Sequence, residues 1–104
     1  MLQKNKIYCM DCREGLAKLN DNSIDLTITS PPYKDEDGFT YELMEIVAKE
    51  LYRVHKNNTL CFINFGHLAH YKNRPFKTAM LFEDIGVEWV DTIVWGKNHY
   101  TPIQ

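Results

Sequence analysis

The sequence has almost no net charge and no long apolar run. Its 104 residues include 12 Lys or Arg and 14 Asp or Glu, which gives a formal net charge of −2 at pH 7. The apolar runs, such as those at residues 60–63 and 93–95, fall far short of the roughly 20 residues that a membrane helix needs. The lysine-bearing N-terminus also lacks the apolar core of a secretory signal. We therefore expect a cytoplasmic protein without a membrane partner, in which a local patch or a partner supplies any attraction for nucleic acid.

Cysteine is scarce as well, with Cys9, Cys12 and Cys61 as its only examples. Such a small, odd number predicts reduced, partly buried thiols in a cytoplasmic protein. Cys9 and Cys12 form a Cys-x-x-Cys pair, but a tetrahedral zinc site needs four ligands. His67 and His70 are of the right type to complete such a site. The two cysteines, however, directly follow an apolar strand pattern, where a thiol can simply pack, so we expect no metal site.

The remaining composition is that of an ordinary globular protein, and we expect residues 1–104 to form a single domain. Short apolar runs alternate along the chain with helical periodicity. The pattern predicts strands at residues 6–10, 24–29, 59–65 and 87–95, and helices at residues 13–19, 41–55 and 75–85. This order predicts an α/β fold with a parallel-rich sheet and helices on both faces.

Local signals mark the ends of the two longer helices. Thr40 is a suitable N-cap for the helix at 41–55, and Asn57-Asn58 is expected to turn the chain into the next strand. Pro75 suits the first turn of the last helix, and Gly86 suits its end.

Ser30-Pro31-Pro32-Tyr33 is the most informative motif, because it directly follows the predicted strand at 24–29. Parallel sheets bind their ligands at the carboxyl ends of their strands. Each proline holds the preceding residue in an extended conformation, which leaves the carbonyls of Ser30 and Pro31 as free acceptors. Such a site suits a planar substrate that stacks on Tyr33 and donates an amine to the Ser30 hydroxyl and a proline carbonyl. The alternative is that the prolines only end the strand and Tyr33 packs against the next helix.

Three other features have simpler interpretations. The acidic run Asp35–Asp37 is expected to face water rather than to bind a metal. Residues 67–74 form a basic and aromatic patch that suits either phosphate contacts or a solvated loop. Four aromatic side chains are expected in the core: Phe62, Phe65, Phe76 and Phe82.

The chain resembles the N-terminal part of beta-type DNA amino-methyltransferases, the S-adenosylmethionine-dependent enzymes that methylate cytosine N4 or adenine N6. The resemblance extends over almost the whole chain, and the Pro-Pro-Tyr motif is its most specific part. Four stretches carry it: residues 7–12 with Leu16, residues 23–33, residues 50–56 and residues 93–98.

The resemblance implies a partial Rossmann-like fold, DNA as the partner and a catalytic role for Ser30-Pro31-Pro32-Tyr33. Ser30 and the Pro31 carbonyl would hold the target amine, Tyr33 would stack on a base flipped out of the duplex, and Trp95 would wall the base pocket. Ser30 stands where adenine enzymes more often carry Asp or Asn, which favours cytosine N4 and leaves adenine N6 open. A restriction–modification system or a mobile element is the setting that the resemblance suggests.

The resemblance also implies S-adenosylmethionine as the methyl donor, with Asp11 and Cys12 near it. The chain departs from the family here, because it lacks the Phe-x-Gly-x-Gly cofactor loop and its glycines stand alone. We therefore expect a truncated catalytic domain that is inactive by itself. One alternative is a non-catalytic remnant or subunit that associates with itself or with a second chain completing the sheet and carrying the cofactor half. Another is a methyltransferase for RNA or protein amides.

Overall fold

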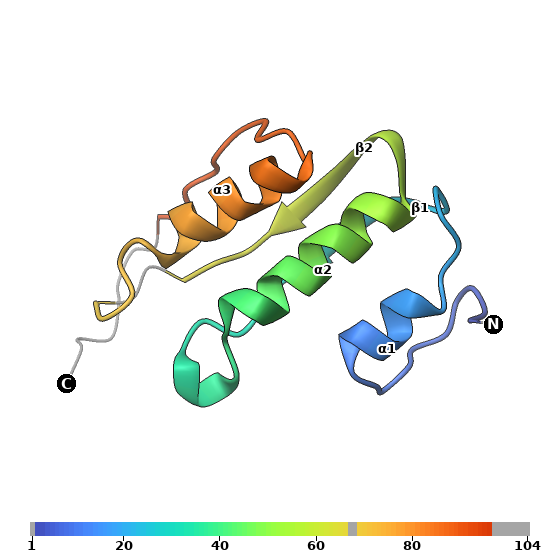
Figure 1. Cartoon of the computed structure of the whole chain (residues 1–104), viewed down its shortest axis with the longest axis horizontal. Coiled ribbons are helices and arrows are strands. Elements are labelled where there is room, and N and C mark those ends of the chain that lie inside the picture. Colours follow the sequence, from blue (N-terminus) through green and yellow to red (C-terminus); the bar gives the residue numbers. More distant parts are fainter. Residues whose placement is uncertain (1, 67–68, 97–104) are drawn as a thin grey trace.

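A computed structural model describes residues 2–66 and 69–96 of the chain (Figure 1). In the described residues, strands and helices alternate as in an α/β protein. In chain order the elements are α1 (Cys12–Ala17), β1 (Ile24–Thr29), the 3-10 helix η1 (Asp35–Asp37), α2 (Tyr41–Val54), β2 (His55–Ile63) and α3 (Arg74–Ile85). None of these helices is long and apolar enough to cross a lipid bilayer.

The two longer helices begin and end where the local signals predict. The Thr40 hydroxyl caps α2 by accepting a hydrogen bond of 3.0 Å from the backbone N–H of Leu43. Pro75 lies in the first turn of α3, where its missing N–H costs nothing. Gly86 ends α3 with a φ of 126°, a conformation that favours glycine. The predictions for these helices and for β1 are confirmed.

The sheet consists of β1 and β2, which pair in parallel with α2 as the crossover between them. Leu26 lies opposite Leu60, and Thr29 lies opposite Ile63. The register shifts near the start of the strands, where residues 56–59 bulge out and Asn58 has a φ of 61°. The predicted turn at Asn57-Asn58 therefore lies inside β2, which begins at His55 and not at residue 59.

Two predicted strands do not form in the part of the chain that the structure describes. Residues 6–10 and 87–95 lie outside the sheet. Their apolar side chains are largely solvent-exposed, with Ile7 fully exposed and Ile93 79% exposed. The sequence pattern shows only that these residues favour an extended conformation. A strand also needs a neighbouring strand with which it can pair in register. The predicted first helix is also shorter than expected and ends at Ala17.

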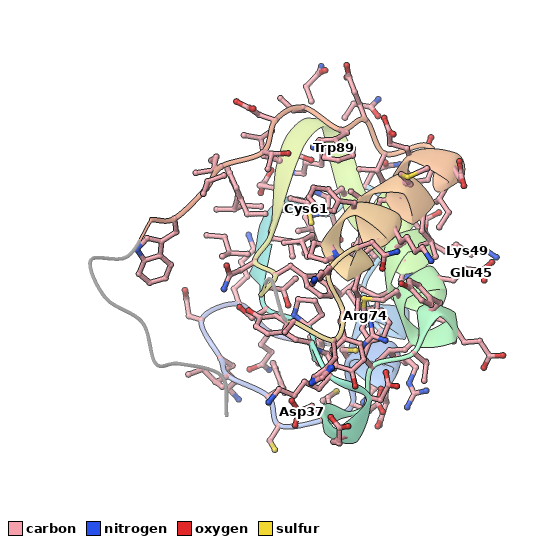
Figure 2. The ribbon with its side chains drawn as sticks, turned by 90° about the vertical axis from the view of Figure 1, so that its left-hand side faces the viewer. Asp37, Glu45, Lys49, Cys61, Arg74 and Trp89 are labelled. Atoms are coloured by element: carbon pink, nitrogen blue, oxygen red, sulfur yellow. The ribbon has the colours of Figure 1, made fainter. Side chains whose placement is uncertain are left out.

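The helices cover one face of the sheet, not both as predicted. Ala48 and Leu51 of α2 pack against Phe82 of α3, and Cys61 and Ile63 of β2 face this cluster. Figure 2 shows the helices gathered on one side of the two strands. The other face is bare and apolar, and its side chains are 42–72% exposed: Leu26, Ile28, Leu60 and Phe62. The alternating apolar residues of β1 thus point away from the helices.

A histidine links the beginnings of the two strands. His55 Nδ1 lies 2.8 Å from the Thr59 hydroxyl, and His55 Nε2 lies 2.7 Å from the Thr27 hydroxyl. The Thr59 hydroxyl donates to the Lys56 carbonyl, so it accepts from Nδ1–H. In the neutral imidazole with its proton on Nδ1, Nε2 accepts from the Thr27 hydroxyl. Burial accordingly lowers the pKa of His55 below its usual 6.5, against a weaker opposing effect of Asp25.

We expect the stability of the fold to decrease in mild acid because of His55. Below pH 6.5 the unfolded chain takes up a proton that the folded chain resists, so stability falls with pH until the lowered folded-state pKa is reached. Urea unfolding at pH 7.5 and pH 5.5 measures this as a modest drop in midpoint. His55→Gln should flatten that dependence, whereas exposed His70→Gln should not. Equal pH dependence in wild type and His55→Gln would contradict the assignment.

Candidate functional site

The carboxyl ends of β1 and β2 bring Ser30 and Asn64 together. The backbone N–H of Asn64 donates to the Thr29 carbonyl at 2.8 Å, which extends the pairing by one residue beyond the strands. The Asn64 side chain then donates to the Ser30 hydroxyl and to the Tyr33 hydroxyl, each at 3.1 Å. One amide group therefore fixes two of the residues that the motif analysis selects.

The Tyr33 ring is held in a narrow space. It stacks on Phe65 with a centroid distance of 5.2 Å and an angle of 28° between the rings. A Cβ atom at Gly66 would lie 2.8 Å from Cδ2 of Tyr33, closer than carbon atoms approach without a shift. The ring is only partly buried, so its position is set by these contacts and not by enclosure in the core.

Acceptor atoms lie beside this ring. In the described residues, no backbone N–H donates to the carbonyls of Ser30 or Pro31. The Ser30 hydroxyl oxygen has two lone pairs, of which Asn64 occupies one. Ser30 and Pro31 can thus accept hydrogen bonds from a planar amine, while Pro32 restricts Pro31 to extended conformations.

The loop after Tyr33 folds back onto α3 through Arg74. Arg74 Nη1 donates to the Tyr33 carbonyl at 2.8 Å, and Arg74 Nη2 lies 2.9 Å from Asp35 Oδ1. The guanidinium also lies 4.0 Å from the centroid of Phe39, a ring that is only 3% exposed. Asp35 is 63% exposed and so faces water as predicted, but it also pairs with Arg74. Arg74, with 11% of its side chain exposed, is not available to phosphates.

The aromatic residues are distributed differently from the prediction. Phe82 is buried as expected, but Phe62 and Phe76 are 42% and 50% exposed, and Phe65 is half-buried in the stack with Tyr33. Phe39, which the pattern does not select, is the buried ring next to the site. His67 of the predicted basic patch lies outside the described residues.

Asp11 and Cys12, the residues expected near a cofactor, lie at the start of α1. The Asp11 carboxylate caps the helix by accepting from the Arg13 backbone N–H at 2.8 Å, and it pairs with the Arg13 guanidinium at 2.7 Å. These bonds from Arg13 lower the pKa of Asp11 to about 2. In the described part of the chain, no hydrogen bond or ion pair connects Asp11 to Ser30 or Tyr33.

Trp95, expected in the wall of a base pocket, lies in the segment after α3 and is 76% exposed. The described contacts of Tyr33 come instead from Asn64, Phe65 and Arg74. Lys97 and Asn98, which complete the similar stretch in the sequence, lie outside the described residues.

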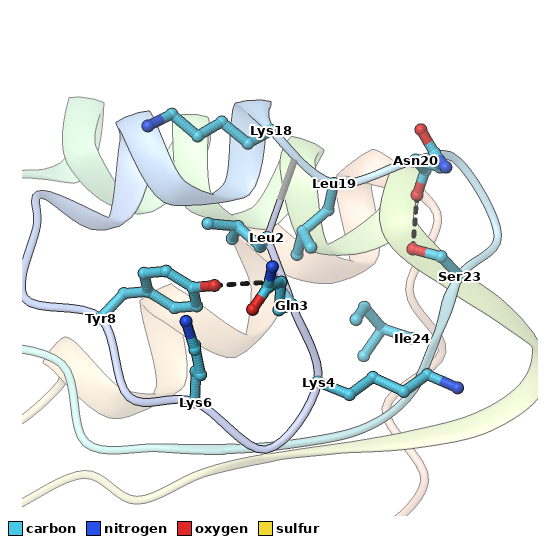
Figure 3. A pocket seen from close by; sticks show the side chains of 10 residues that line it. All are labelled: Leu2, Gln3, Lys4, Lys6, Tyr8, Lys18, Leu19, Asn20, Ser23 and Ile24. Carbon is cyan, nitrogen blue, oxygen red and sulfur yellow. Dashed lines mark hydrogen bonds between the residues drawn. The ribbon is translucent and has the colours of Figure 1, made fainter.

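A cavity of about 420 Å³ lies at the other end of β1 (Figure 3). Ser23 and Ile24 line it together with residues 18–20, which follow α1, and with the N-terminal segment, in which the Tyr8 hydroxyl accepts from the Gln3 backbone N–H. A strand rises roughly 3.3 Å per residue, so the length of β1 separates this cavity from Ser30. We therefore do not assign the cavity to the site.

The cysteine thiols are all unpaired. Cys61 is half-buried in β2, and burial raises the pKa of its thiol to about 11, which makes it a poor nucleophile. Cys9 and Cys12 are exposed and not partly buried as predicted.

Asn64, Gly66 and Arg74 are the site residues that sequence reasoning misses. Asn64 carries a signal that resembles that of Ser30, because both are polar residues at the end of an apolar strand. The apolar pattern, however, predicts a strand that continues to residue 65, so it does not indicate that the strand ends at Ile63. Nothing near Arg74 in the sequence indicates its partners, which lie far away along the chain.

Two methyltransferases are similar to this chain. The orphan methyltransferase M.BamHII of Bacillus amyloliquefaciens is 34% identical over 86 residues, which cover 77% of this chain and 32% of that protein. The Type II methyltransferase M.MwoI of Methanothermobacter wolfeii is 29% identical over an alignment of 122 residues. The alignment covers 95% of this chain and 18% of that protein. The chain thus spans about a third or less of the length of these relatives. No family model and no solved structure matches the chain.

Proposed function

We propose that this chain is the amine-holding part of an S-adenosylmethionine-dependent DNA methyltransferase with a Rossmann-like fold. The similarity to two methyltransferases over most of the chain supports this proposal. The two parallel strands with a helical crossover are compatible with it. Because the chain spans 32% and 18% of these relatives, we attribute the complete reaction to a larger assembly and only amine binding to this chain.

The bridge from Asn64 to Ser30 and Tyr33 carries the proposal. It places a hydroxyl oxygen and a flat ring at the carboxyl end of a strand, which is where α/β sheets bind ligands. In the proposed complex the base stacks on Tyr33, and its amine donates to the Ser30 hydroxyl and to the Pro31 carbonyl. These acceptors orient the nitrogen lone pair away from the ring plane, toward an incoming methyl group.

The proposed substrate is a base flipped out of DNA, because an exocyclic amine inside a duplex cannot reach such a site. Flipping costs a few kcal/mol, which stacking on Tyr33 and the two hydrogen bonds would offset. Ser30 favours cytosine N4 over adenine N6 in this proposal. Trp95 is proposed to border the base pocket.

The residues present do not form a site for the whole methyl donor. The Asp11 carboxylate is already bonded to Arg13, and α1 has only six residues. The sequence has no glycine-rich turn, and its two glycines with positive φ, Gly38 and Gly86, follow helices and not strands. Asp11 and Cys12 are therefore proposed only to border the donor.

Titration of the isotope-labelled chain with nucleosides tests the proposal. Deoxycytidine should shift the NMR signals of Ser30, Tyr33 and Asn64, whereas thymidine, which has a carbonyl in place of the amine, should bind at least about tenfold more weakly. Deoxyadenosine distinguishes the two amine substrates. Ser30→Ala should reduce the preference for the amine, because only the Pro31 carbonyl then accepts from it.

Equal shifts with thymidine and deoxycytidine would contradict amine binding. Shifts confined to the residues around the cavity at the start of β1 would contradict the location. A preference for deoxyadenosine would retain the site and replace cytosine by adenine as its base.

A second proposal is that the chain is a subunit that pairs with a chain carrying the cofactor half. The bare apolar face formed by Leu26, Ile28, Leu60 and Phe62 favours it, since soluble monomers rarely leave such a face uncovered. Sedimentation of the purified chain separates a monomer from a self-associated form.

A further inference from the structure

Arg74 occupies a position that helix energetics alone do not favour. It is the first residue of α3, where the helix dipole favours an anion over a cation. The preceding Asn73 makes no side-chain cap, so the start of α3 lacks the usual support. Nevertheless the Arg74 side chain is only 11% exposed. Its burial must therefore be explained by what it contacts.

The guanidinium of Arg74 uses both its edge and its faces. Its edge holds the Tyr33 carbonyl and the Asp35 carboxylate. Its faces contact two rings, with distances of 4.0 Å to the centroid of Phe39 and 3.9 Å to that of Tyr71. Figure 2 shows Arg74 between α3 and the loop that contains Asp37. Only a planar, multiply donating cation satisfies all four contacts, which excludes lysine as an equivalent.

A chain of ring contacts connects Arg74 to the Tyr33 side chain by a second route. Phe39, which the guanidinium covers, meets Phe65 edge to face at 6.0 Å. Phe65 in turn stacks on Tyr33 at 5.2 Å. Arg74 thus fixes Tyr33 directly at its backbone carbonyl and indirectly through Phe39 and Phe65. The backbone contact and the ring contacts thus hold the loop that carries the amine-holding motif from two sides.

We propose that Arg74 is the positioning residue that fixes the Tyr33 ring for stacking on the base. This inference rests on the proposed function, but it concerns the ring and not the transfer of a methyl group. Arg74 does not touch the base in this proposal. It acts through the backbone and the ring of Tyr33.

Arg74→Lys tests the proposal, with Arg53→Lys as the matched control. Arg53 is also a multiply bonded arginine, since it donates to the carbonyls of Leu16 and Leu19 and pairs with Asp21. It lies at the junction of α1 and α2, and none of these partners belongs to the site. Both variants keep the charge and lose the planar group.

We would measure two quantities for each variant: the NMR signals of the Tyr33 ring without ligand, and the affinity for deoxycytidine. We expect Arg74→Lys to shift the Tyr33 ring signals and to weaken deoxycytidine binding about tenfold, as misplacement of a binding group does. Arg53→Lys should change neither, whatever it does to the unfolding midpoint. If Arg74→Lys does not fold, Tyr71→Leu removes only one of the two rings around the guanidinium and should act in the same direction.

The two measurements separate the inference from the proposed function. If Tyr33 shifts in Arg74→Lys while the wild type binds no nucleoside, the role of Arg74 stands and the proposed function fails. If Arg74→Lys binds deoxycytidine as the wild type does and its Tyr33 signals stay in place, the inference is overturned. Equal losses in Arg74→Lys and Arg53→Lys would overturn it too, because a general effect on the fold would explain both.

Discussion

Phe82→Ala is expected to leave a large part of the chain unfolded at 25 °C. Phe82 is 7% exposed and packs against Ala48 and Leu51 in the cluster that joins α2 to α3. Truncation of a buried phenylalanine costs about 3–5 kcal/mol. Proteins of this size have a total stability near the lower end of about 5–15 kcal/mol. In the residues that the structure describes, two strands and a largely exposed sheet face leave little to compensate for such a loss.

Phe76→Ala is the matched control for Phe82→Ala. Phe76 lies on the same helix but is 50% exposed, so its removal should cost less than about 1 kcal/mol. Urea unfolding followed by circular dichroism measures both variants. Equal losses for the two phenylalanines would show that the cluster of Ala48, Leu51 and Phe82 is not the core of this fold.

Gly66→Ala is expected to abolish most of the base binding and to spare the fold. A Cβ atom at position 66 would lie 2.8 Å from Cδ2 and 3.0 Å from Cε2 of Tyr33, so the ring must leave its place on Phe65. Gly66 is not among the glycines with positive φ, so alanine fits its backbone. A replacement that fits without strain stabilises a protein by about 0.4–1 kcal/mol through the unfolded state, and here this gain would offset the cost of moving the ring. We therefore expect at least about a tenfold loss of deoxycytidine affinity without a lower unfolding midpoint.

Gly96→Ala controls for the general effect of adding a methyl group. Among the described residues, nothing lies within 4 Å of a Cβ atom at position 96, and the φ of Gly96 is not positive either. Nucleoside titration of both variants should show normal affinity for Gly96→Ala. Normal affinity for Gly66→Ala would mean that the position of the Tyr33 ring does not matter for binding.

The features that the sequence predicts well are those that depend on neighbouring residues. Thr40 caps α2 and Gly86 ends α3 because the responsible groups lie within one turn of the helix end. The motif at Ser30 is predictable for a similar reason, since the prolines act on the residues before them. Its place at the sheet edge then follows from the strand that precedes it.

The features that the sequence does not predict depend on distant partners. Arg74 meets Tyr33 and Asp35 across 41 and 39 positions of the chain, and no local pattern records such contacts. The segment at residues 87–95 has the side chains of a strand but pairs with no strand in the described part of the chain. The apolar alternation of β1 predicts that Leu26 and Ile28 are buried, but both are exposed, because the helices cover the opposite face, with Thr27 and Thr29.

Deoxycytidine labelled with ¹⁵N at its amine gives the most direct test of the central claim that this chain holds the amine of a base. When the unlabelled chain is added, the two amine protons should shift downfield and separate, because each acquires its own acceptor at Ser30 and Pro31. Ser30→Ala should remove the shift of one proton and leave the other. Binding of deoxycytidine with an unchanged amine signal, or an equal shift in Ser30→Ala, would contradict the claim.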